Sequence, residues 1–511
     1  MTETSKQFQK QLPRNIIFQI LSFGTQGIAG IWLIPYLISH LGTAAYGLVL
    51  IASVLTQYVN LISDSISAAV NRFYTIALNK HDLTEANSIL STAFFSYIGI
   101  GALQVPLFII LIYYANILIS IPNELYHDMI VLLICSAGTF IINLIASVFG
   151  VVMYANNRID LLRLIDIIRV ISRLVGIVFL FLIFGPALKY VGYSYIATSI
   201  LIFLLYVFLV KRLQPSLKIS VKFFKLNKVN PLLKMGFWVL INQIGALLFL
   251  RMDVWVCNRF VDPSAAGEYA ALLQWPTLIR QSGITVASVL APMIMIYFAK
   301  SELLNLIRLS QESVRLLSLL IAVPVGIICI ASPSILTIWL GKDFNGLAWL
   351  LVIMLCHLVV NVGITPLFTV QVALNKIRIP ALITLFGGLL NILLAICAAK
   401  YLGFGVYGVA MAGALVLTAK NALFTPLYVA KILHRPWHTF LKPIFVAVFC
   451  FMILLLVYRW FYLCLAPSSL IQLLIFATLA GGFGIIAVWL VLPNQSRSLL
   501  TSMIFKRVKA L

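Results

Sequence analysis

The chain has 511 residues, of which 62% are hydrophobic and only 10% are charged. Soluble domains are close to half apolar and a quarter charged, so this composition excludes a soluble enzyme or binding module and indicates a polytopic membrane protein. The net charge of +22 does not indicate a nucleic-acid-binding protein, because no soluble module carries the cations.

Apolar runs long enough to cross a bilayer, which takes about 20 residues of helix, recur along the whole chain. Fourteen such runs are predicted: 14–38, 46–70, 89–115, 130–153, 164–184, 190–210, 235–257, 269–298, 316–340, 347–374, 381–399, 404–430, 443–463 and 470–492. The first is too long for a signal peptide and is expected to be retained. The sequence therefore predicts an all-α fold with 14 transmembrane helices.

The basic residues follow the expected membrane topology. They concentrate in every second connection, most densely between Lys211 and Lys234, whereas the remaining connections hold only Lys189, Arg259, Lys342 and Lys400. By the positive-inside rule, both termini are predicted to be cytoplasmic.

A faint internal repeat divides the chain at this basic stretch. The motif that ends at Gly47 recurs in outline up to Gly267, and Asn156 is echoed by Asn375 at nearly the same offset. Six spans per half predict two lobes in parallel orientation, related by a pseudo-twofold axis along the membrane normal. We expect an N-terminal lobe (1–210), a basic cytoplasmic linker (211–234), a C-terminal lobe (235–438), and two further helices with a basic tail (439–511).

Polar side chains at helical spacing mark faces that avoid lipid in four of the spans. The first two spans carry Asn15, Gln19, Ser22, Gln26, Asn60 and Asp64 in such stripes. Interhelical hydrogen bonds would explain any single stripe. Stripes in equivalent helices of both halves favour a shared aqueous cavity.

The fifth span carries a more specific pattern, because charged residues recur every three or four positions and share one face. They are Arg163, Asp166, Arg169 and Arg173. We expect Asp166 to neutralise only one of the three arginines. An arginine in hydrocarbon is costly, so this face should look into water or onto an anionic partner.

Cations outnumber anions within the predicted spans, so we predict a positively charged cavity. Its proposed lining is Arg163, Arg169, Arg173, Arg251, Arg280, Lys420, Gln19, Gln26 and Asn60. Guanidinium groups bind phosphates and carboxylates bidentately, which predicts an anionic cargo. Candidates for ion coupling are Asp64, Asp166, Asp253 and His357, each of which also fits a packing role. Arg251 and Asp253 have a further alternative, in which they snorkel to the interface.

These residues resemble the polysaccharide transporters, the Wzx-type lipid-linked oligosaccharide flippases of the MATE-like (MOP) superfamily. The landmarks are Leu41-Gly42 with Tyr46-Gly47, Asn71-Arg72, Asp253, Trp339-Leu340-Gly341, and Ala373-Leu374-Asn375-Lys376 leading into Gly387-Gly388 and Asn391. One departure is Ile66, where the family often has glycine.

The resemblance implies two six-helix lobes around a central cationic cavity and two extra C-terminal helices. It also implies outward transport of an undecaprenyl-diphosphate-linked sugar unit, for O-antigen or another surface polysaccharide, across a bacterial cytoplasmic (inner) membrane. Membrane lipids, a polymerase and a chain-length regulator would be partners.

Three other functions remain open at this stage. A lipid II flippase fits the same residue pattern. A cation-coupled drug exporter would need an acid-rich cavity, and a membrane-embedded polymerase would need a sizeable extramembrane loop with catalytic groups. The seven cysteines have no metal-ligand spacing, so we expect neither a metal nor a cofactor.

Overall fold

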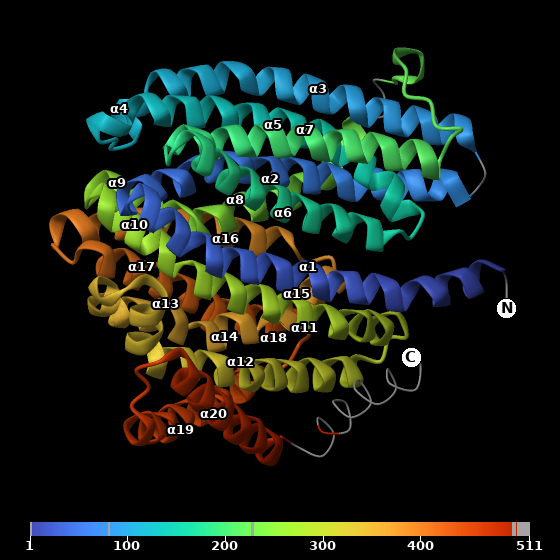
Figure 1. Cartoon of the computed structure of the whole chain (residues 1–511). Coiled ribbons are helices and arrows are strands. Elements are labelled where there is room, and N and C mark those ends of the chain that lie inside the picture. Colours follow the sequence, from blue (N-terminus) through green and yellow to red (C-terminus); the bar gives the residue numbers. More distant parts are fainter. Residues whose placement is uncertain (1–2, 80–81, 226–228, 493–496, 498–511) are drawn as a thin grey trace. The chain divides into compact units, whose positions relative to one another are not determined.

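The computed structural model describes residues 3–79, 82–225, 229–492 and 497, and every element within them is helical (Figure 1). The first half contains α1 (Glu3–Leu41), α2 (Thr43–Asn79), α3 (Leu83–Tyr113), α4 (Ala115–Leu118), α5 (Tyr126–Ala155), α6 (Ile159–Phe184) and α7 (Leu188–Leu213). The second contains α8 (Val229–Leu250), α9 (Met252–Phe260), α10 (Pro263–Leu272), α11 (Gln274–Ala299), α12 (Leu303–Leu340), α13 (Ala348–Cys356), α14 (Leu358–Gly363), α15 (Thr365–Ala373), α16 (Arg378–Ile396), α17 (Gly405–Thr418), α18 (Thr425–Ile432), α19 (Leu441–Leu465) and α20 (Leu470–Val491).

The all-α, polytopic membrane fold predicted from hydropathy is confirmed. In the described residues 12 helical segments are long and apolar enough to cross a membrane, and the bent pair α8–α9 makes 13. Helix α2 adds a shorter apolar stretch, Thr43–Val54, within the part searched. These numbers are compatible with the predicted fourteen spans.

Several predicted spans are built from more than one helix. The seventh bends by 42° between Leu250 and Met252, so that Arg251 lies at the break. The twelfth contains a π-helical turn, Ala419–Phe424, between α17 and α18. Such wide turns are frequent at functional sites. Pro366 lies in the first turn of α15, where its missing N–H interrupts no helical hydrogen bond.

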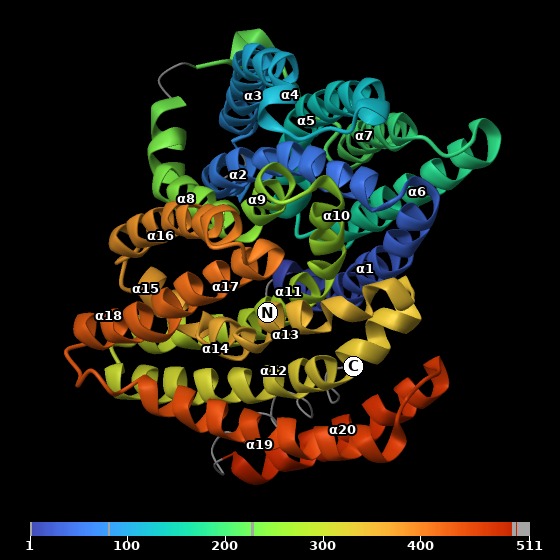
Figure 2. The same ribbon diagram turned by 90° about the vertical axis from the view of Figure 1, so that its left-hand side faces the viewer.

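Backbone contacts divide the chain into two compact units. Unit 1 comprises Met1–Ile244 together with Cys257–Ala270. Its core lies around α5, which packs against α2 and α7 (Figure 2). Large side chains such as Tyr74 and Phe140 are fully buried there. Gly192 brings α7 against the α5 backbone, because a Cβ atom at this position would lie 3.1 Å from the Leu132 Cα.

Two repeat-equivalent corners meet within unit 1. A Cβ atom added at Gly47 would lie 2.8 Å from the Gly267 backbone nitrogen, and one at Gly267 would overlap the Thr43 carbonyl oxygen. The Thr43 and Ser264 hydroxyls are hydrogen-bonded to each other. Only glycine permits such a close backbone approach. These residues form the corner contact.

Unit 2 comprises Gly245–Val256 and Ala271–Leu511 and is organised around α12. The C-terminal helices α19 and α20 lie alongside α12 (Figure 2). Tyr458 of α19 is fully buried and contacts the glycine positions Gly326 of α12 and Gly484 of α20. A capping box formed by Ser469 and Gln472 starts α20.

The ends of the fourth and tenth predicted spans share one backbone geometry. Asn157 and Asn375 both adopt left-handed conformations, with φ of 54° and 52°. The next amide donates back in each case, from Arg158 to Met153 O and from Lys376 to Gln371 O, as in a Schellman cap. The structural counterpart of Asn375 is thus Asn157, one residue after the Asn156 proposed from the sequence.

Candidate functional site

The predicted arginine face of α6 is present. The two Asp166 oxygens contact two arginines, at 3.0 Å to Arg163 Nη1 and 2.9 Å to Arg169 Nη1. One carboxylate carries one negative charge, so two of the three arginine charges stay uncompensated although Asp166 contacts both Arg163 and Arg169. One carboxylate bridges both, because the i,i+3 spacing places an arginine on each side of it.

Arg173 lies one turn further along α6 and is held by an aromatic ring instead of a carboxylate. Its guanidinium carbon lies 4.1 Å from the centroid of the Tyr195 ring of α7, a cation–π arrangement. Ser194 donates a hydrogen bond of 2.8 Å to the Arg173 carbonyl oxygen. Gly176 admits this approach, because a Cβ atom there would lie 2.6 Å from Ser194 Oγ.

All three arginines keep hydrogen-bonding capacity. The Nε atoms of Arg163, Arg169 and Arg173 are buried and have no hydrogen-bond partner in the described part of the chain. The side chains of Arg163 and Arg169 are 37% and 32% exposed. One face of α6 therefore carries three guanidinium groups, one carboxylate, and three buried N–H donors that a rotation of the arginine side chains would present to an oxyanion.

A charged cluster at the start of α6 was not foreseen from the sequence. Asp160 is only 2% exposed and forms ion pairs with Arg14 of α1 at 2.9 Å and with Arg158 at 3.0 Å. No role for it is predicted from the sequence. Asn15 Oδ1 accepts a hydrogen bond of 2.9 Å from the Asp160 amide. The available signal was an acidic residue in the first turn of a helix that directly follows a polar turn.

The stripe of the first span is divided between two roles. Asn15 and Ser22 are buried at 6% and 2% exposure and serve packing. Gln19 is half-buried and Gln26 is exposed, with its amide donating 3.0 Å to Ser22 Oγ. The side chains of Asn60 and Asp64 lie outside the described residues.

The charged residues of the seventh span are placed differently from one another. Asp253 is only 7% exposed and accepts a hydrogen bond of 3.2 Å from the fully buried Asn391 of α16. Gly413 of α17 faces this pair, since a Cβ atom there would lie 3.5 Å from Asp253 Oδ2. Arg251 is half-buried at the break between α8 and α9. Asp253 does not snorkel, because its carboxylate is enclosed by other helices.

His357 takes part in a polar group between α14 and α17. The Asn361 amide lies 2.7 Å from His357 Nδ1 and 3.1 Å from Thr418 Oγ1. Lys420 lies in the adjacent π-helical turn, with its amine 5.3 Å from the centroid of the Phe368 ring. Arg280 of α11 is half-buried and lies within electrostatic reach of His357.

The predicted site residues thus form separate groups. Within unit 1, α6 gathers Arg163, Asp166, Arg169 and Arg173. Within unit 2, the pair Asp253–Asn391 and the group around His357 lie on α9, α14, α16 and α17. The described residues contain no cluster of His, Cys, Asp and Glu that could hold a metal ion.

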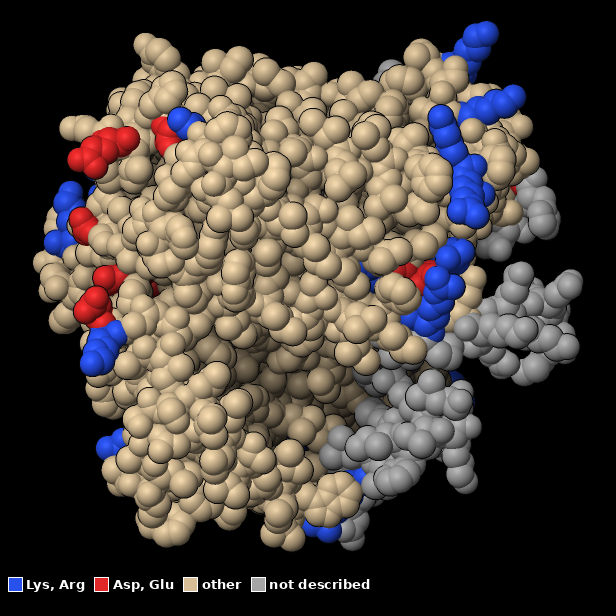
Figure 3. Space-filling view, viewed as in Figure 1, with Lys and Arg blue, Asp and Glu red and all other residues tan. Residues whose placement is uncertain are grey.

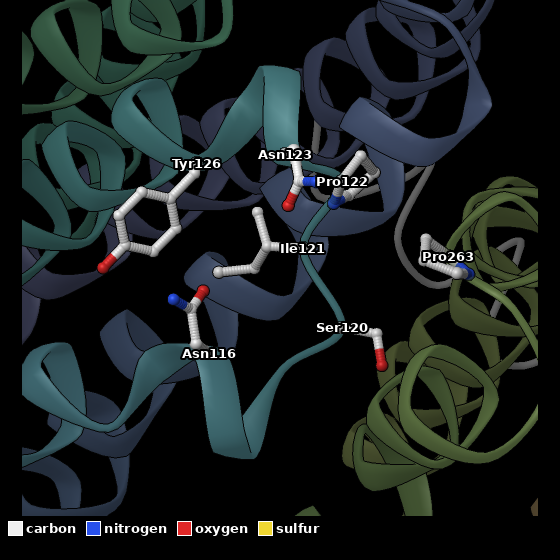
Figure 4. Close-up of a pocket in the computed structure, with 7 residues that line it drawn as sticks. All are labelled: Asn116, Ser120, Ile121, Pro122, Asn123, Tyr126 and Pro263. Atoms are coloured by element: carbon white, nitrogen blue, oxygen red, sulfur yellow. The ribbon is translucent and has the colours of Figure 1, made fainter.

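Unit 1 also carries a polar groove of about 560 Å³ that none of the predicted site residues lines. Figure 4 shows its amide, hydroxyl and aromatic side chains around the segment between α4 and α5. Ser120 is fixed there by the side chain of Asn258, which is 1% exposed. The Ser120 backbone amide donates to Asn258 Oδ1 at 2.8 Å, and Asn258 Nδ2 donates to the Ser120 carbonyl oxygen at 3.1 Å. The lining residues are Asn116, Ser120, Ile121, Pro122, Asn123, Tyr126 and Pro263.

Known proteins match this chain along most of its length. The family described as polysaccharide biosynthesis protein matches residues 12–298. The uncharacterized membrane protein EpsK of Bacillus subtilis is 30% identical over 439 residues, which is 85% of this chain and 87% of that protein.

Solved transporters share the fold. The inward closed conformation of the lipid II flippase MurJ superimposes with a TM-score of 0.70 at 16% identity, covering 96% of this chain and 100% of that chain. An inward-facing multidrug resistance MATE family transporter of the MOP superfamily gives a TM-score of 0.61 at 16% identity, over 80% and 94%. The family resemblance drawn from the sequence is confirmed by the family match, and the fold is the one that these solved transporters share. The chain belongs to the polysaccharide biosynthesis protein family and is a multi-pass membrane protein with the MOP transporter fold.

Proposed function

We propose that this protein is a flippase that translocates an undecaprenyl-diphosphate-linked oligosaccharide unit, from O-antigen or another surface polysaccharide, outward across the bacterial cytoplasmic membrane. The observation that carries the proposal is the α6 face, where three arginines share one carboxylate and each retains a buried Nε–H donor without a partner in the described residues. A diphosphate supplies the acceptor oxygens that these donors lack.

Electrostatics favours an anionic head group over a cationic drug at this face. Moving a bare phosphate into hydrocarbon would cost tens of kcal/mol, so a carrier must replace its water with donors and positive charge. Guanidinium groups do so with paired N–H bonds. The oligosaccharide would travel with the diphosphate, while the polyprenyl tail stays in the bilayer.

We propose that Gln19, Gln26, Asn60, Arg251, Arg280 and Lys420 complete the cationic lining during transport. Asp253 is the strongest candidate for ion coupling, because its carboxylate is only 7% exposed and accepts a hydrogen bond from Asn391. His357, Asp166 and Asp64 are further candidates. A buried carboxylate that binds and releases a cation would link the ion gradient to the conformational cycle.

Topology and partners complete the proposal. The distribution of basic residues supports a topology with both termini in the cytoplasm. A polymerase and a chain-length regulator that use the delivered repeat unit are the expected partners of such a flippase.

A lipid II flippase is the second candidate, because the TM-score of 0.70 with MurJ spans almost the whole of both chains. Both cargoes are lipid-linked sugars, so the α6 face alone fits either one. Complementation separates them: strains depleted of their lipid II flippase would grow with this chain only if it accepts lipid II.

The experiment that tests the proposal replaces Arg173 by glutamine and measures surface polysaccharide together with the amount of protein in the membrane. Arg459→Gln is the matched control, because Arg459 also lies over a tyrosine, Tyr462, at 5.9 Å but is exposed. We expect the Arg173 variant to lose surface polysaccharide at normal protein level and the control to retain it. Full surface polysaccharide in Arg173→Gln and Arg169→Gln would contradict the proposed role of the α6 face.

A further inference from the structure

The basic stretch after α7 includes a short segment that is fixed along α3. Helix α7 ends at Leu213, and residues Leu217–Lys225, here called the strap, follow α3 in the opposite sense to α7 (Figure 1). Four buried polar residues of α3 hold it: Asn87, Ser88, Ser91 and Thr92, at 8%, 1%, 0% and 0% exposure. Their i, i+1, i+4 and i+5 spacing places all four on one helix face.

Each of these four side chains binds the backbone of the strap. The amides of Lys218, Ser220 and Lys225 donate to Asn87 Oδ1 at 3.1 Å, Ser91 Oγ at 3.3 Å and Thr92 Oγ1 at 3.1 Å. Ser88 Oγ donates to the Phe223 carbonyl oxygen at 3.0 Å. Because these bonds engage main-chain groups, they fix the path of the strap and leave its side chains available for other contacts.

The side chains of the strap divide between two directions. Leu217 and Ile219 pack against the core of unit 1, and Phe224 contacts Phe95 of α3 with ring centroids 6.3 Å apart. The outward-facing residues are Lys218, Val221, Lys222 and Lys225, which are exposed, Val221 at 70%. The strap therefore presents a fixed row of ammonium groups around one apolar side chain.

The length of α3 places this row at the depth of the lipid head groups. A helix of 31 residues is about 46 Å long, whereas the hydrocarbon core is about 30 Å thick. The apolar run of α3 begins at Ile89, so the turns that bind the strap lie where α3 leaves the hydrocarbon. In Figure 3, blue side chains gather at this end of unit 1, at the upper right.

We propose that the strap, with Lys211 and Arg212 in the last turn of α7, is a binding surface for anionic phospholipid head groups of the cytoplasmic leaflet. All five cations are exposed, and residues 211–225 contain no acidic side chain. Lysine suits this partner, because lipid phosphates arrive in many orientations and a point charge imposes no fork geometry. Val221 inserts among the acyl chains nearest the head groups. This surface is independent of the transported cargo.

The test places a local reporter in the strap of the full-length protein. Val221→Trp is reconstituted in phosphatidylcholine vesicles that contain phosphatidylglycerol, with one of the two lipids brominated. The quenching of the added tryptophan, taken as the difference from the unsubstituted chain, gives the relative affinity of the strap for the two lipids. We expect preference for phosphatidylglycerol, and a loss of about fivefold per lysine at low salt when lysines are replaced.

Two triple variants in the reporter background complete the design. Lys218→Gln/Lys222→Gln/Lys225→Gln should abolish the preference for phosphatidylglycerol, whereas the matched control Lys300→Gln/Arg308→Gln/Lys431→Gln removes three exposed cations from unit 2 and should leave it unchanged. Equal quenching by the two brominated lipids in the reporter chain would overturn the proposal, as would an equal loss in both triple variants. Displacement of phosphatidylglycerol by sub-stoichiometric undecaprenyl diphosphate would instead assign the strap to the cargo.

Discussion

Replacement of Gly267 by alanine is the most direct test of the corner contact. The added Cβ atom would overlap the Thr43 carbonyl oxygen and lie 3.1 Å from the Thr43 Cα. These are backbone atoms of α2, so they cannot rotate away and the two helices must separate. Overpacking of this kind costs about 1–3 kcal/mol, and we expect the upper part of that range. Alanine has a higher helix propensity than glycine, which stabilises α10 by up to about 1 kcal/mol. The net decrease in the free energy of unfolding is then about 2 kcal/mol.

Thermal unfolding of the detergent-purified protein, followed by circular dichroism, measures this loss. The matched control is Gly99→Ala in α3, where a new Cβ atom meets nothing within 4 Å and the helix should become slightly more stable. Gly47→Ala should destabilise the protein less than Gly267→Ala. Its new Cβ atom would lie 2.8 Å from the Gly267 nitrogen, a less severe approach than the overlap of the Gly267→Ala Cβ atom with the Thr43 carbonyl oxygen.

The double substitution at Gly47 and Gly267 adds a check on the geometry. Both methyl groups demand the same separation of α2 and α10, so the second should cost less than it does alone. A melting temperature of Gly267→Ala equal to or above that of the unsubstituted chain would refute the close backbone approach. Strictly additive losses would show that the two sites act independently.

Three further outcomes are expected. If the corner contact must separate during transport, a disulfide between Thr43→Cys and Ser264→Cys should stop flipping in vesicles, and a reductant should restore it. Undiminished flipping by the cross-linked protein would exclude this movement. The two single-cysteine variants are the controls. Asp160→Asn removes the charge that binds two arginines and should lower the unfolding free energy by about 1.5–3 kcal/mol, and an unchanged melting curve would contradict that assignment. Asp253→Asn should leave the fold intact but remove the dependence of flipping on a cation gradient, and a persistent dependence would remove Asp253 from the coupling site.

The transmembrane architecture could be predicted because a bilayer imposes a strong constraint on sequence. Every spanning segment must satisfy its backbone internally and present apolar side chains to lipid, so hydropathy marks the spans directly. The breaks within spans could not be predicted in the same way. Arg251 and Asp253 interrupt an otherwise apolar run, and whether a helix bends at such residues depends on the helices that pack around it.

The candidate site could be predicted only as far as spacing along one helix determines it. The i,i+3 and i,i+4 pattern placed Arg163, Asp166, Arg169 and Arg173 on one face of α6. It could not predict that Tyr195 would hold Arg173, because that contact joins two helices. The ion pairs of Asp160 could not be predicted from the spacing along α6, because its partners come from α1 and from the preceding turn. The alternation of lysine with leucine, isoleucine and phenylalanine in the strap is visible in the sequence, but the attachment of the strap to α3 depends on hydrogen bonds between segments far apart in the chain.

The attachment of the last two helices has a consequence for how this protein changes shape. Within unit 2, α19 packs mainly on α12 and α14, and α20 on α12 and α19, while much of their remaining surface exposes large apolar side chains. A hairpin attached in this way moves with α12. When α12 tilts, α19 and α20 tilt with it and displace fluid acyl chains, which rearrange at little energetic cost. Membrane thickness and viscosity should therefore resist the movement of this hairpin. The lipid composition around it would then raise or lower the rate of the transport cycle.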